Sequence, residues 1–174
     1  RNMQFELYVG AMLTLGGASI TFADPDLRLL NGTENIGIAA KRISSPKQFE
    51  KRVHEGARQI KKLNDRGLIA VNLDVLVKNL TLEGDISERG ERFNMQIEEK
   101  MRKLDKFFEE KTELLGIINI GHRTEWSFKE DKPIVDLAQF YQFRLFFNND
   151  EEERLWKPFF QNTIARIEKS LSHL

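Results

Sequence analysis

The chain has 174 residues, enough for one domain that buries roughly two-thirds of its unfolded surface. It contains no cysteine, which excludes disulfides, thiolate metal sites and cysteine nucleophiles, and its 27 basic residues balance 27 acidic ones, so a bulk basic excess typical of nucleic-acid binders is missing. No apolar run approaches the roughly 20 residues that span a bilayer, and the first residues lack a signal-peptide pattern. We therefore expect a cytoplasmic protein with no membrane partner.

The first predicted element is a helix over residues 3 to 15, where apolar residues recur at helical spacing before Gly16-Gly17. Glu6 lies within this largely apolar helix. Two interpretations of Glu6 are open at this stage: a carboxylate at the helix edge, or a carboxylate that faces a site.

A short strand at 18 to 22 precedes two apolar runs, 26 to 30 and 36 to 43. Asn31-Gly32 between them is the strongest short signal for a β-hairpin turn. Successive side chains of a strand point to opposite faces, so position 39 and Lys41 share a face. Closing the hairpin would bring Asp26 beside both.

A helix is predicted from Ser45 to about Asn64, with Ser45 as the cap, Pro46 at the first helical position and Gln48 completing a capping box. One stripe of it is apolar: Phe49, Val53, Ala57, Ile60 and Leu63. Between Lys41 and Lys62 we count eight basic residues against two acidic ones, Glu50 and Glu55. This local excess predicts a basic helix surface.

The run from 68 to 77 is almost continuously apolar, as expected of a central strand covered on both faces, which favours an α/β sandwich. A polar loop over 79 to 92 and a helix from 93 to 115 are predicted next. Two further strands, 116 to 128 and 134 to 147, are predicted to form a hairpin, although the second run could instead begin as a helix. A helix from 151 to 171 closes the chain, with Phe160, Ile164, Ile167 and Leu171 inward.

Pro25-Asp26, followed by Ala39-Ala40-Lys41 on the second strand of the hairpin, resembles the motif of the PD-(D/E)XK, restriction-endonuclease-like nuclease superfamily. The order Glu6, Asp26, Lys41, Gln59 also matches, so the resemblance covers about residues 3 to 77. It implies a mixed β-sheet between helices, an αβββαβ core, extended here by the C-terminal hairpin and helix. We expect one nuclease-like domain over 1 to 174, with the extension at about 93 to 174. Because the chain begins at Arg1 rather than Met, we expect a fragment of a longer protein.

The resemblance implies a Mg²⁺-dependent (or Mn²⁺-dependent) DNA endonuclease of the restriction or phage-defence type. Asp26 would bind the metal, Glu6 would assist through a water, Lys41 would activate the attacking water, and Gln59 would touch the phosphate backbone. The residues expected to contact nucleic acid are Arg42, Ser44, Lys47, Lys51, Arg52 and Arg58. Carboxylate oxygens are the ligands that Mg²⁺ prefers.

Ala39 departs from the motif, because the superfamily carries a carboxylate there and metal binding would be weakened without it. Three explanations are open: an engineered glutamate-to-alanine change, a naturally inactive binding domain, or a carboxylate from elsewhere, namely Glu34, Glu50 or Glu55. We favour the first, since the residues around position 39 still match an intact site.

Other functions compete with the nuclease. One is a non-catalytic nucleic-acid-binding or protein-assembly module on the same fold, and another is a protein-interaction domain that uses the aromatic C-terminal half. Homodimerisation or further domains of a longer chain are compatible with either. His54 and His122 have no second ligand at metal spacing, which argues against a histidine metal site.

Overall fold

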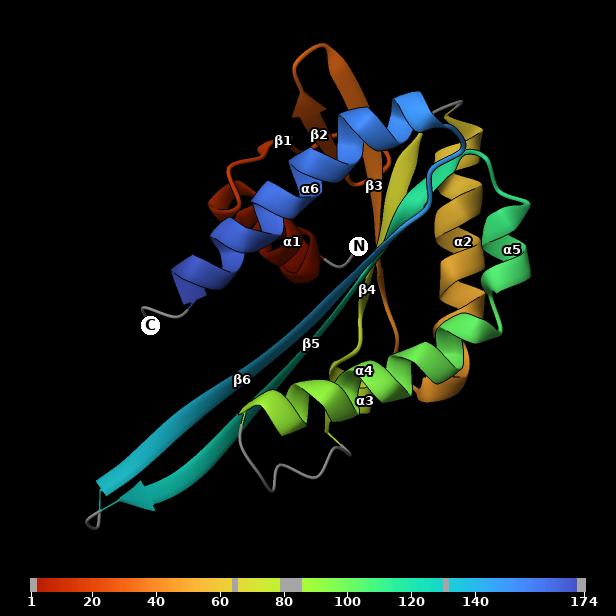
Figure 1. Ribbon diagram of the computed structural model, residues 1–174. Coiled ribbons are helices and arrows are strands. Elements are labelled where there is room, and N and C mark those ends of the chain that lie inside the picture. Colours follow the sequence, from red (N-terminus) through yellow and green to blue (C-terminus); the bar gives the residue numbers. More distant parts are fainter. Residues whose placement is uncertain (1–2, 64–65, 79–85, 130–131, 172–174) are drawn as a thin grey trace.

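The computed structural model describes residues 3–63, 66–78, 86–129 and 132–171. Figure 1 shows an α/β fold in which a mixed sheet lies between helices. Within the described residues the sheet has six strands in sequential order, β1 to β6. Strands β3, β4 and β5 are parallel to one another, and the remaining neighbours are antiparallel. The predicted coarse fold class is therefore confirmed.

The N-terminal half contains helix α1 (Met3–Leu15), strands β1 (Ser19–Thr21), β2 (Leu27–Asn31) and β3 (Glu34–Arg42), a 3-10 turn η1 (Pro46–Gln48), helix α2 (Phe49–Lys62) and strand β4 (Gly67–Asn72). The predicted β2–β3 hairpin is present. Its two-residue turn is Gly32-Thr33, because Asn31 still pairs with Glu34, and Gly32 adopts a positive φ of 62° that glycine tolerates without strain.

The C-terminal half contains helices α3 (Asp74–Val77), α4 (Ile86–Arg102) and α5 (Asp105–Glu109), strands β5 (Leu114–Lys129) and β6 (Lys132–Leu145), and helix α6 (Asp150–Leu171). The predicted hairpin and final helix are thus present. Beyond Ile120, β5 no longer pairs with β4, and β5 and β6 continue as a two-stranded ribbon that projects past the rest of the sheet (Figure 1).

Alternating residues of the central strands supply two apolar cores, one on each face of the sheet. On one face Ala39, Ile69 and Val71 pack with apolar side chains of α2, α4 and α5. On the other face Ile38 and Ala70 pack with apolar side chains of α1 and α6. Strands β3 and β4 are therefore covered on both sides, which was predicted for the run that contains β4 but not for β3.

Three predicted elements were wrong. Residues 74 to 77 form α3 instead of continuing the strand, because the Asn72 side chain accepts a hydrogen bond from the Asp74 N–H and turns the chain. Helix α4 already begins at Ile86 within the predicted loop, whose residues 79–85 lie outside the described residues. The predicted helix over 93 to 115 divides into α4, α5 and the start of β5, and Leu115 is a buried strand residue.

The expected capping box at the start of the second helix was also wrong. Ser45 makes no side-chain cap, and the Gln48 side chain instead accepts hydrogen bonds from the backbone N–H and the hydroxyl of Ser44. Pro46 does stand at the first position of η1, as predicted. Leu63, expected in the apolar stripe, is 37% exposed because it follows the end of α2.

Of the predicted inward residues of the last helix, Phe160 and Ile167 are buried and Ile164 is half-buried. The side chain of Leu171 lies outside the described residues. Among the helices that the structure describes, none is both long and apolar enough to cross a bilayer.

Candidate functional site

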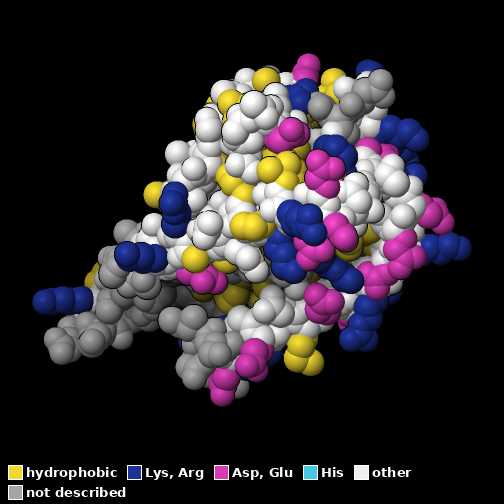
Figure 2. Space-filling view, turned by 45° about the horizontal axis from the view of Figure 1, so that its top comes forward, with side chains coloured by type: hydrophobic (Ala, Val, Ile, Leu, Met, Phe, Trp, Pro, Cys, Tyr) yellow, Lys and Arg dark blue, Asp and Glu magenta, His cyan; other side chains and the backbone are white. Residues whose placement is uncertain are grey.

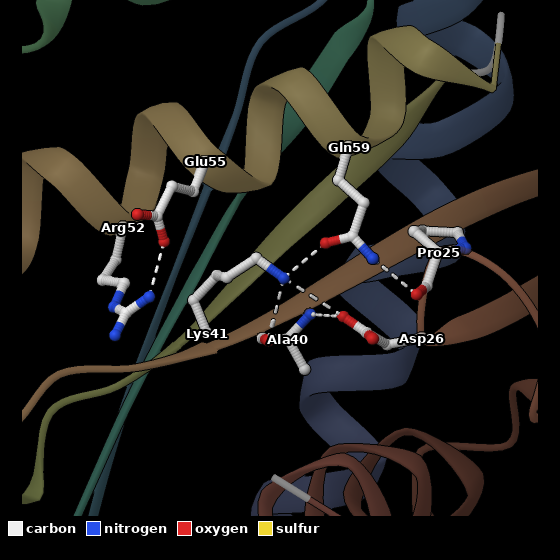
Figure 3. Close-up of polar contacts among 7 residues, drawn as sticks. All are labelled: Pro25, Asp26, Ala40, Lys41, Arg52, Glu55 and Gln59. Carbon is white, nitrogen blue, oxygen red and sulfur yellow. Dashed lines mark hydrogen bonds and ion pairs between the residues drawn. The ribbon is translucent and has the colours of Figure 1, made fainter. Parts of the chain in front are cut away.

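The β2–β3 hairpin brings Asp26 and Lys41 together. Asp26 directly precedes β2, and Lys41 is the penultimate residue of β3. One carboxylate oxygen of Asp26, Oδ2, accepts a hydrogen bond of 2.9 Å from the Ala40 N–H and lies 3.3 Å from Lys41 Nζ (Figure 3). Both side chains are mostly enclosed, with 13% of Asp26 and 14% of Lys41 exposed. Because little water reaches them, the Lys41 ammonium and the Asp26 carboxylate compensate each other's charge through this ion pair.

Gln59 on α2 completes this cluster from the neighbouring helix. Its Oε1 accepts a hydrogen bond of 2.5 Å from Lys41 Nζ, and its Nε2 donates one of 2.6 Å to the Pro25 carbonyl oxygen. The Gln59 amide therefore binds both parts of the motif: Pro25, which precedes Asp26, and Lys41. We expected Gln59 to contact the phosphate backbone of a nucleic acid, and here both polar ends of its side chain bind the protein itself.

The ammonium of Lys41 has three contacts, with Asp26, Gln59 and the Ala40 carbonyl oxygen at 3.2 Å. An ammonium has three N–H groups, so these contacts use its full donor capacity. A phosphate oxygen could bind Lys41 only by replacing one of them. The 3.3 Å contact with Asp26 is the longest of the three, and it is the contact that a cation at Asp26 would also displace.

Ala39 lies on the α2 side of the sheet and is completely buried. Its core neighbours include Ile43, Val53 and Ala57. A carboxylate at this position would enter an apolar environment unless it reached the polar cluster of Asp26 and Lys41. Burying an unpaired carboxylate is costly, so the structure around position 39 constrains any acidic replacement strongly.

Glu6 occupies α1, on the face of the sheet opposite α2, and is only 4% exposed. It is thus a buried carboxylate and not a solvated residue at the helix edge. Glu6 is a residue of α1 and Gln59 is a residue of α2, so the two side chains come from helices on opposite faces of the sheet.

The three glutamates considered as replacements for a residue-39 carboxylate lie in different places. Glu34 pairs with Asn31 beside the hairpin turn, at the opposite end of β3 from Lys41, so this explanation was wrong for Glu34. Glu50 is an exposed residue in the first turn of α2. Glu55 is one helical turn before Gln59 and binds Arg52 over 2.6 Å (Figure 3).

The pKa of Glu55 is lowered, first by its hydrogen bond from Arg52, which outweighs the opposing effect of burial, and further by the positive charges of Arg52, Lys51 and Lys41. Glu55 is therefore held as a carboxylate by the basic residues around it. The ion pair between Glu55 and Arg52 also compensates part of the positive charge that we predicted for the surface of α2.

The predicted basic surface lies beside this cluster. Of the residues assigned to nucleic-acid contact, Arg42, Ser44, Lys47, Lys51 and Arg58 are exposed, and Arg52 is half-buried through its ion pair with Glu55. Figure 2 shows lysine and arginine side chains, interspersed with acidic ones, over the side of the molecule where α2 and α5 lie. Positive charge is thus available to a polyanion close to Lys41.

A second polar cluster, which the sequence did not reveal, lies where β4 and β5 lead into α3 and the ribbon. The Asp74 carboxylate accepts hydrogen bonds from the Asn72 amide at 3.0 Å and from the His122 N–H at 2.8 Å, and lies 3.0 Å from His122 Nδ1. The ring of Tyr8 meets the His122 ring edge to face at 4.3 Å. Only the Asn72-Leu73-Asp74 pattern, a turn signal, could have indicated it.

Burial and hydrogen bonding act in opposite directions on Asp74. Burial raises its pKa, but the hydrogen bonds from His122 and Asn72 together outweigh burial and lower the pKa below its ordinary value. Burial also raises the pKa of Tyr8, helped by the charge of Asp74, and raises the pKa of Tyr141 to about 12. The cluster therefore holds an ionised carboxylate beside neutral tyrosines at neutral pH.

The residues near Asp26 fall short of a complete magnesium site. Throughout the part of the chain that the structure describes, no three histidine or acidic side chains are grouped closely enough to hold a metal ion. Asp26 has the oxygen ligand chemistry that Mg²⁺ prefers, but Ala39 offers no side-chain ligand. As it stands, the cluster offers an anion the exposed basic residues of α2, whereas Lys41 binds an anion only by giving up one of its three contacts.

Comparisons with protein-family models, with curated proteins and with solved structures found no match to this chain.

Proposed function

We propose that this chain is a DNA endonuclease domain of the PD-(D/E)XK type, with a restriction-endonuclease-like fold, in a form that Ala39 impairs. The observation that carries the proposal is the convergence of Asp26, Lys41 and Gln59 at one point between a hairpin and the next helix. The order α1, β1, β2, β3, α2, β4 supports it, because the same order defines the αβββαβ core that the motif implies.

The chemistry of the cluster suits a phosphodiester. Lys41 can neutralise charge on a phosphate oxygen once it exchanges its contact with Asp26, and the exposed Lys51 and Arg58 can bind neighbouring phosphates. Gln59 would keep Lys41 oriented during that exchange. A bound Mg²⁺ would polarise the phosphate and lower the pKa of a bound water, and Asp26 would hold it without a ligand from Ala39.

Restoring the carboxylate tests this proposal. Ala39→Glu is incubated with supercoiled plasmid and Mg²⁺ or Mn²⁺, beside Ala39→Gln, which has the same size but no charge. We expect nicking or linearisation by the glutamate variant alone, and its loss on adding Lys41→Ala. A folded Ala39→Glu variant that leaves plasmid intact with both metals would remove the main support for a nuclease.

A carboxylate supplied by Glu55 makes a different prediction from the same assay. Glu55 and Gln59 are four residues apart and so share one side of α2, and Lys41 is among the charges that act on Glu55. If Glu55 serves as the second ligand, the native chain should cut plasmid with Mn²⁺, and Glu55→Gln should abolish cutting. An inactive native chain would reject this explanation.

The second candidate is a non-catalytic nucleic-acid-binding module, and the complete burial of Ala39 among apolar side chains favours it. Such a module would bind DNA through the basic surface beside Lys41 without any metal. Binding that is unchanged by EDTA, together with plasmid left intact by the glutamate variant, would support this candidate over the nuclease.

A further inference from the structure

Helix α5 lies beside α2 on the same face of the sheet (Figure 1). The two helices meet where the His54 ring of α2 and the Phe107 ring of α5 have their centroids 4.2 Å apart. The Lys111 ammonium, two residues after the end of α5, lies 5.6 Å from the centroid of the same Phe107 ring. We call the contact between His54 and Phe107 the α2–α5 seam. It joins the outer surfaces of the two helices into one continuous surface.

The α2 side of this seam is basic. Lys51 and Arg58 are three and four residues from His54, so both are its neighbours on the helix surface. Both side chains are exposed, and Lys61, two helical turns after His54, is exposed as well. The seam therefore has a row of positive charge on its α2 side.

The α5 side carries positive charge too. Lys103 and Lys106 are exposed, and Lys111 is half-buried over the Phe107 ring. Across residues 46–63 and 103–111 the exposed basic residues outnumber the exposed acidic ones: Lys47, Lys51, Arg58, Lys61, Lys62, Lys103 and Lys106 against Glu50, Glu109 and Glu110. Two further carboxylates in these ranges, Glu55 and Asp105, form ion pairs with Arg52 and Arg144. Because the net charge of the chain is zero, this basic excess is a local property of the α2–α5 surface.

We propose that the α2–α5 surface binds the backbone of duplex DNA, and that Lys103, Lys106 and Lys111 form the second of its two basic rows. The proposal rests on the proposed function in taking DNA as the polyanion. Neutralisation of phosphates by lysine and arginine releases condensed counterions, which supplies most of the affinity of such surfaces.

The separation of the two rows favours a duplex over a single strand. Packed helices lie about 8 to 10 Å apart, so the rows of α2 and α5 stand at about that distance. A duplex presents two strands of phosphates across grooves about 6 and 12 Å wide, so one strand can meet α2 while the other meets α5. A single strand offers only one row of phosphates.

The proposal also gives the duplex a direction across α2. One flank of this helix carries Gln59, which binds Lys41 of the motif, and the other carries His54, which contacts Phe107 of α5. Helix α2 therefore lies between the motif and α5. A duplex that contacts the exposed Lys51 and Arg58 at the motif would extend over α2 onto α5.

The salt dependence of binding to a labelled duplex tests the α5 row. We expect Lys103→Gln/Lys106→Gln/Lys111→Gln to lose up to about three units of the logarithmic salt slope and at least about tenfold in affinity at low salt. The matched control is Arg154→Gln/Lys157→Gln/Lys169→Gln on α6, which should bind like the native chain. A folded α5 variant with the native slope and affinity would overturn the proposal.

A variant of opposite sign tests the same row without removing a lysine. Glu109 and Glu110 are exposed at the end of α5, so Glu109→Gln/Glu110→Gln removes two negative charges from the surface. We expect this variant to bind the duplex more tightly than the native chain, by at least about twofold at low salt. Unchanged or weaker binding would place the DNA away from α5.

Competition with a single strand of the same length tests the choice of a duplex. We expect the unlabelled duplex to compete at least about tenfold better than the single strand, because only the duplex engages both basic rows. Equal competition by the two nucleic acids would overturn the duplex as the partner of this surface.

The plasmid assay separates this proposal from the proposed nuclease. Cutting by Ala39→Glu together with native DNA binding by the α5 variant would overturn the α5 row alone. A folded Ala39→Glu variant that leaves plasmid intact, together with weakened binding by the α5 variant, would support the α5 row and reject the nuclease.

Discussion

Gln59 Oε1 accepts a hydrogen bond of 2.5 Å from Lys41 Nζ, while the same side chain donates to the Pro25 carbonyl oxygen. Gln59 therefore connects α2 to β3 and to the turn that leads into β2. Because each polar end of this side chain binds the protein, Gln59 orients the lysine. We regard Gln59 as a positioning residue on these grounds.

Replacing Gln59 with alanine should lower the free energy of unfolding by about 1 to 3 kcal/mol, because a partly buried ammonium and a carbonyl oxygen each lose a partner. Chemical denaturation measures the change. Arg58→Ala is the matched control on the same helix, since Arg58 is exposed, and it should change stability by less than about 0.5 kcal/mol. Equal effects of the two substitutions would show that Gln59 does not hold the motif together.

Placing a glutamate at position 39 should make folding depend on divalent cations. The side chain enters an apolar core, and leaving its charge unpaired there costs several kcal/mol. A cation shared with Asp26 would offset this cost. Thermal unfolding should show a lower midpoint for Ala39→Glu in EDTA and a clear rise with Mn²⁺. Ala39→Gln should show no rise, and an equal response of both variants would argue against a shared cation.

Asp74 should stabilise the fold at neutral pH and less so in acid. Its pKa is lowered in the folded state, so its contribution is present above the unfolded value of about 3.9 and is lost as pH falls through the folded pKa. Asp74→Asn should therefore lower the unfolding midpoint at pH 7, and the difference from the native chain should shrink below about pH 4. Glu109→Gln, an exposed control on α5, should show no such convergence.

Two helical glycines should respond in opposite directions to alanine. A Cβ at Gly56 would lie 2.9 Å from Ile69 Cγ2, so the Ile69 side chain or α2 itself must shift. Overpacking of this kind costs about 1 to 3 kcal/mol and exceeds the gain in helix propensity of about 1 kcal/mol. At Gly90 on α4 a Cβ meets nothing within 4 Å, so only the gain remains. Denaturation curves should show Gly56→Ala destabilised and Gly90→Ala stabilised. A stabilised Gly56→Ala would contradict the close packing of α2 on β4.

The sequence predicted the elements whose local signals agree with their packing. The hairpin of Asp26 and Lys41 follows from alternation around a glycine turn, and the buried stripe of α2 follows from its helical period. The prediction of a strand over residues 74 to 77 was wrong because a short apolar run does not distinguish a strand from a helix. The hydrogen bonds of Asp74 favour the helix here. The hydrogen bonds between Asp74 and His122 join residues that are far apart in the sequence, so no local pattern predicts them.

The candidate site could likewise be predicted only in part from the sequence. Spacing along β3 predicts that Ala39 and Lys41 share a face, but not that α2 buries Ala39 while Lys41 stays at the edge. The predicted capping box is absent because the Gln48 side chain accepts hydrogen bonds from the backbone N–H and the hydroxyl of Ser44 instead. Such choices depend on tertiary packing, which a residue pattern does not encode.

Binding of a labelled DNA duplex at increasing salt tests most directly whether this surface meets a phosphate backbone. We expect the native chain to bind, with affinity that falls steeply with salt, and Lys51→Gln/Arg52→Gln/Arg58→Gln to lose up to about three units of the logarithmic salt slope. Arg154→Gln/Lys157→Gln/Lys169→Gln, which removes three exposed charges from α6, should bind like the native chain. No binding at low salt, or equal losses in the two triple variants, would contradict a nucleic-acid site beside Asp26 and Lys41.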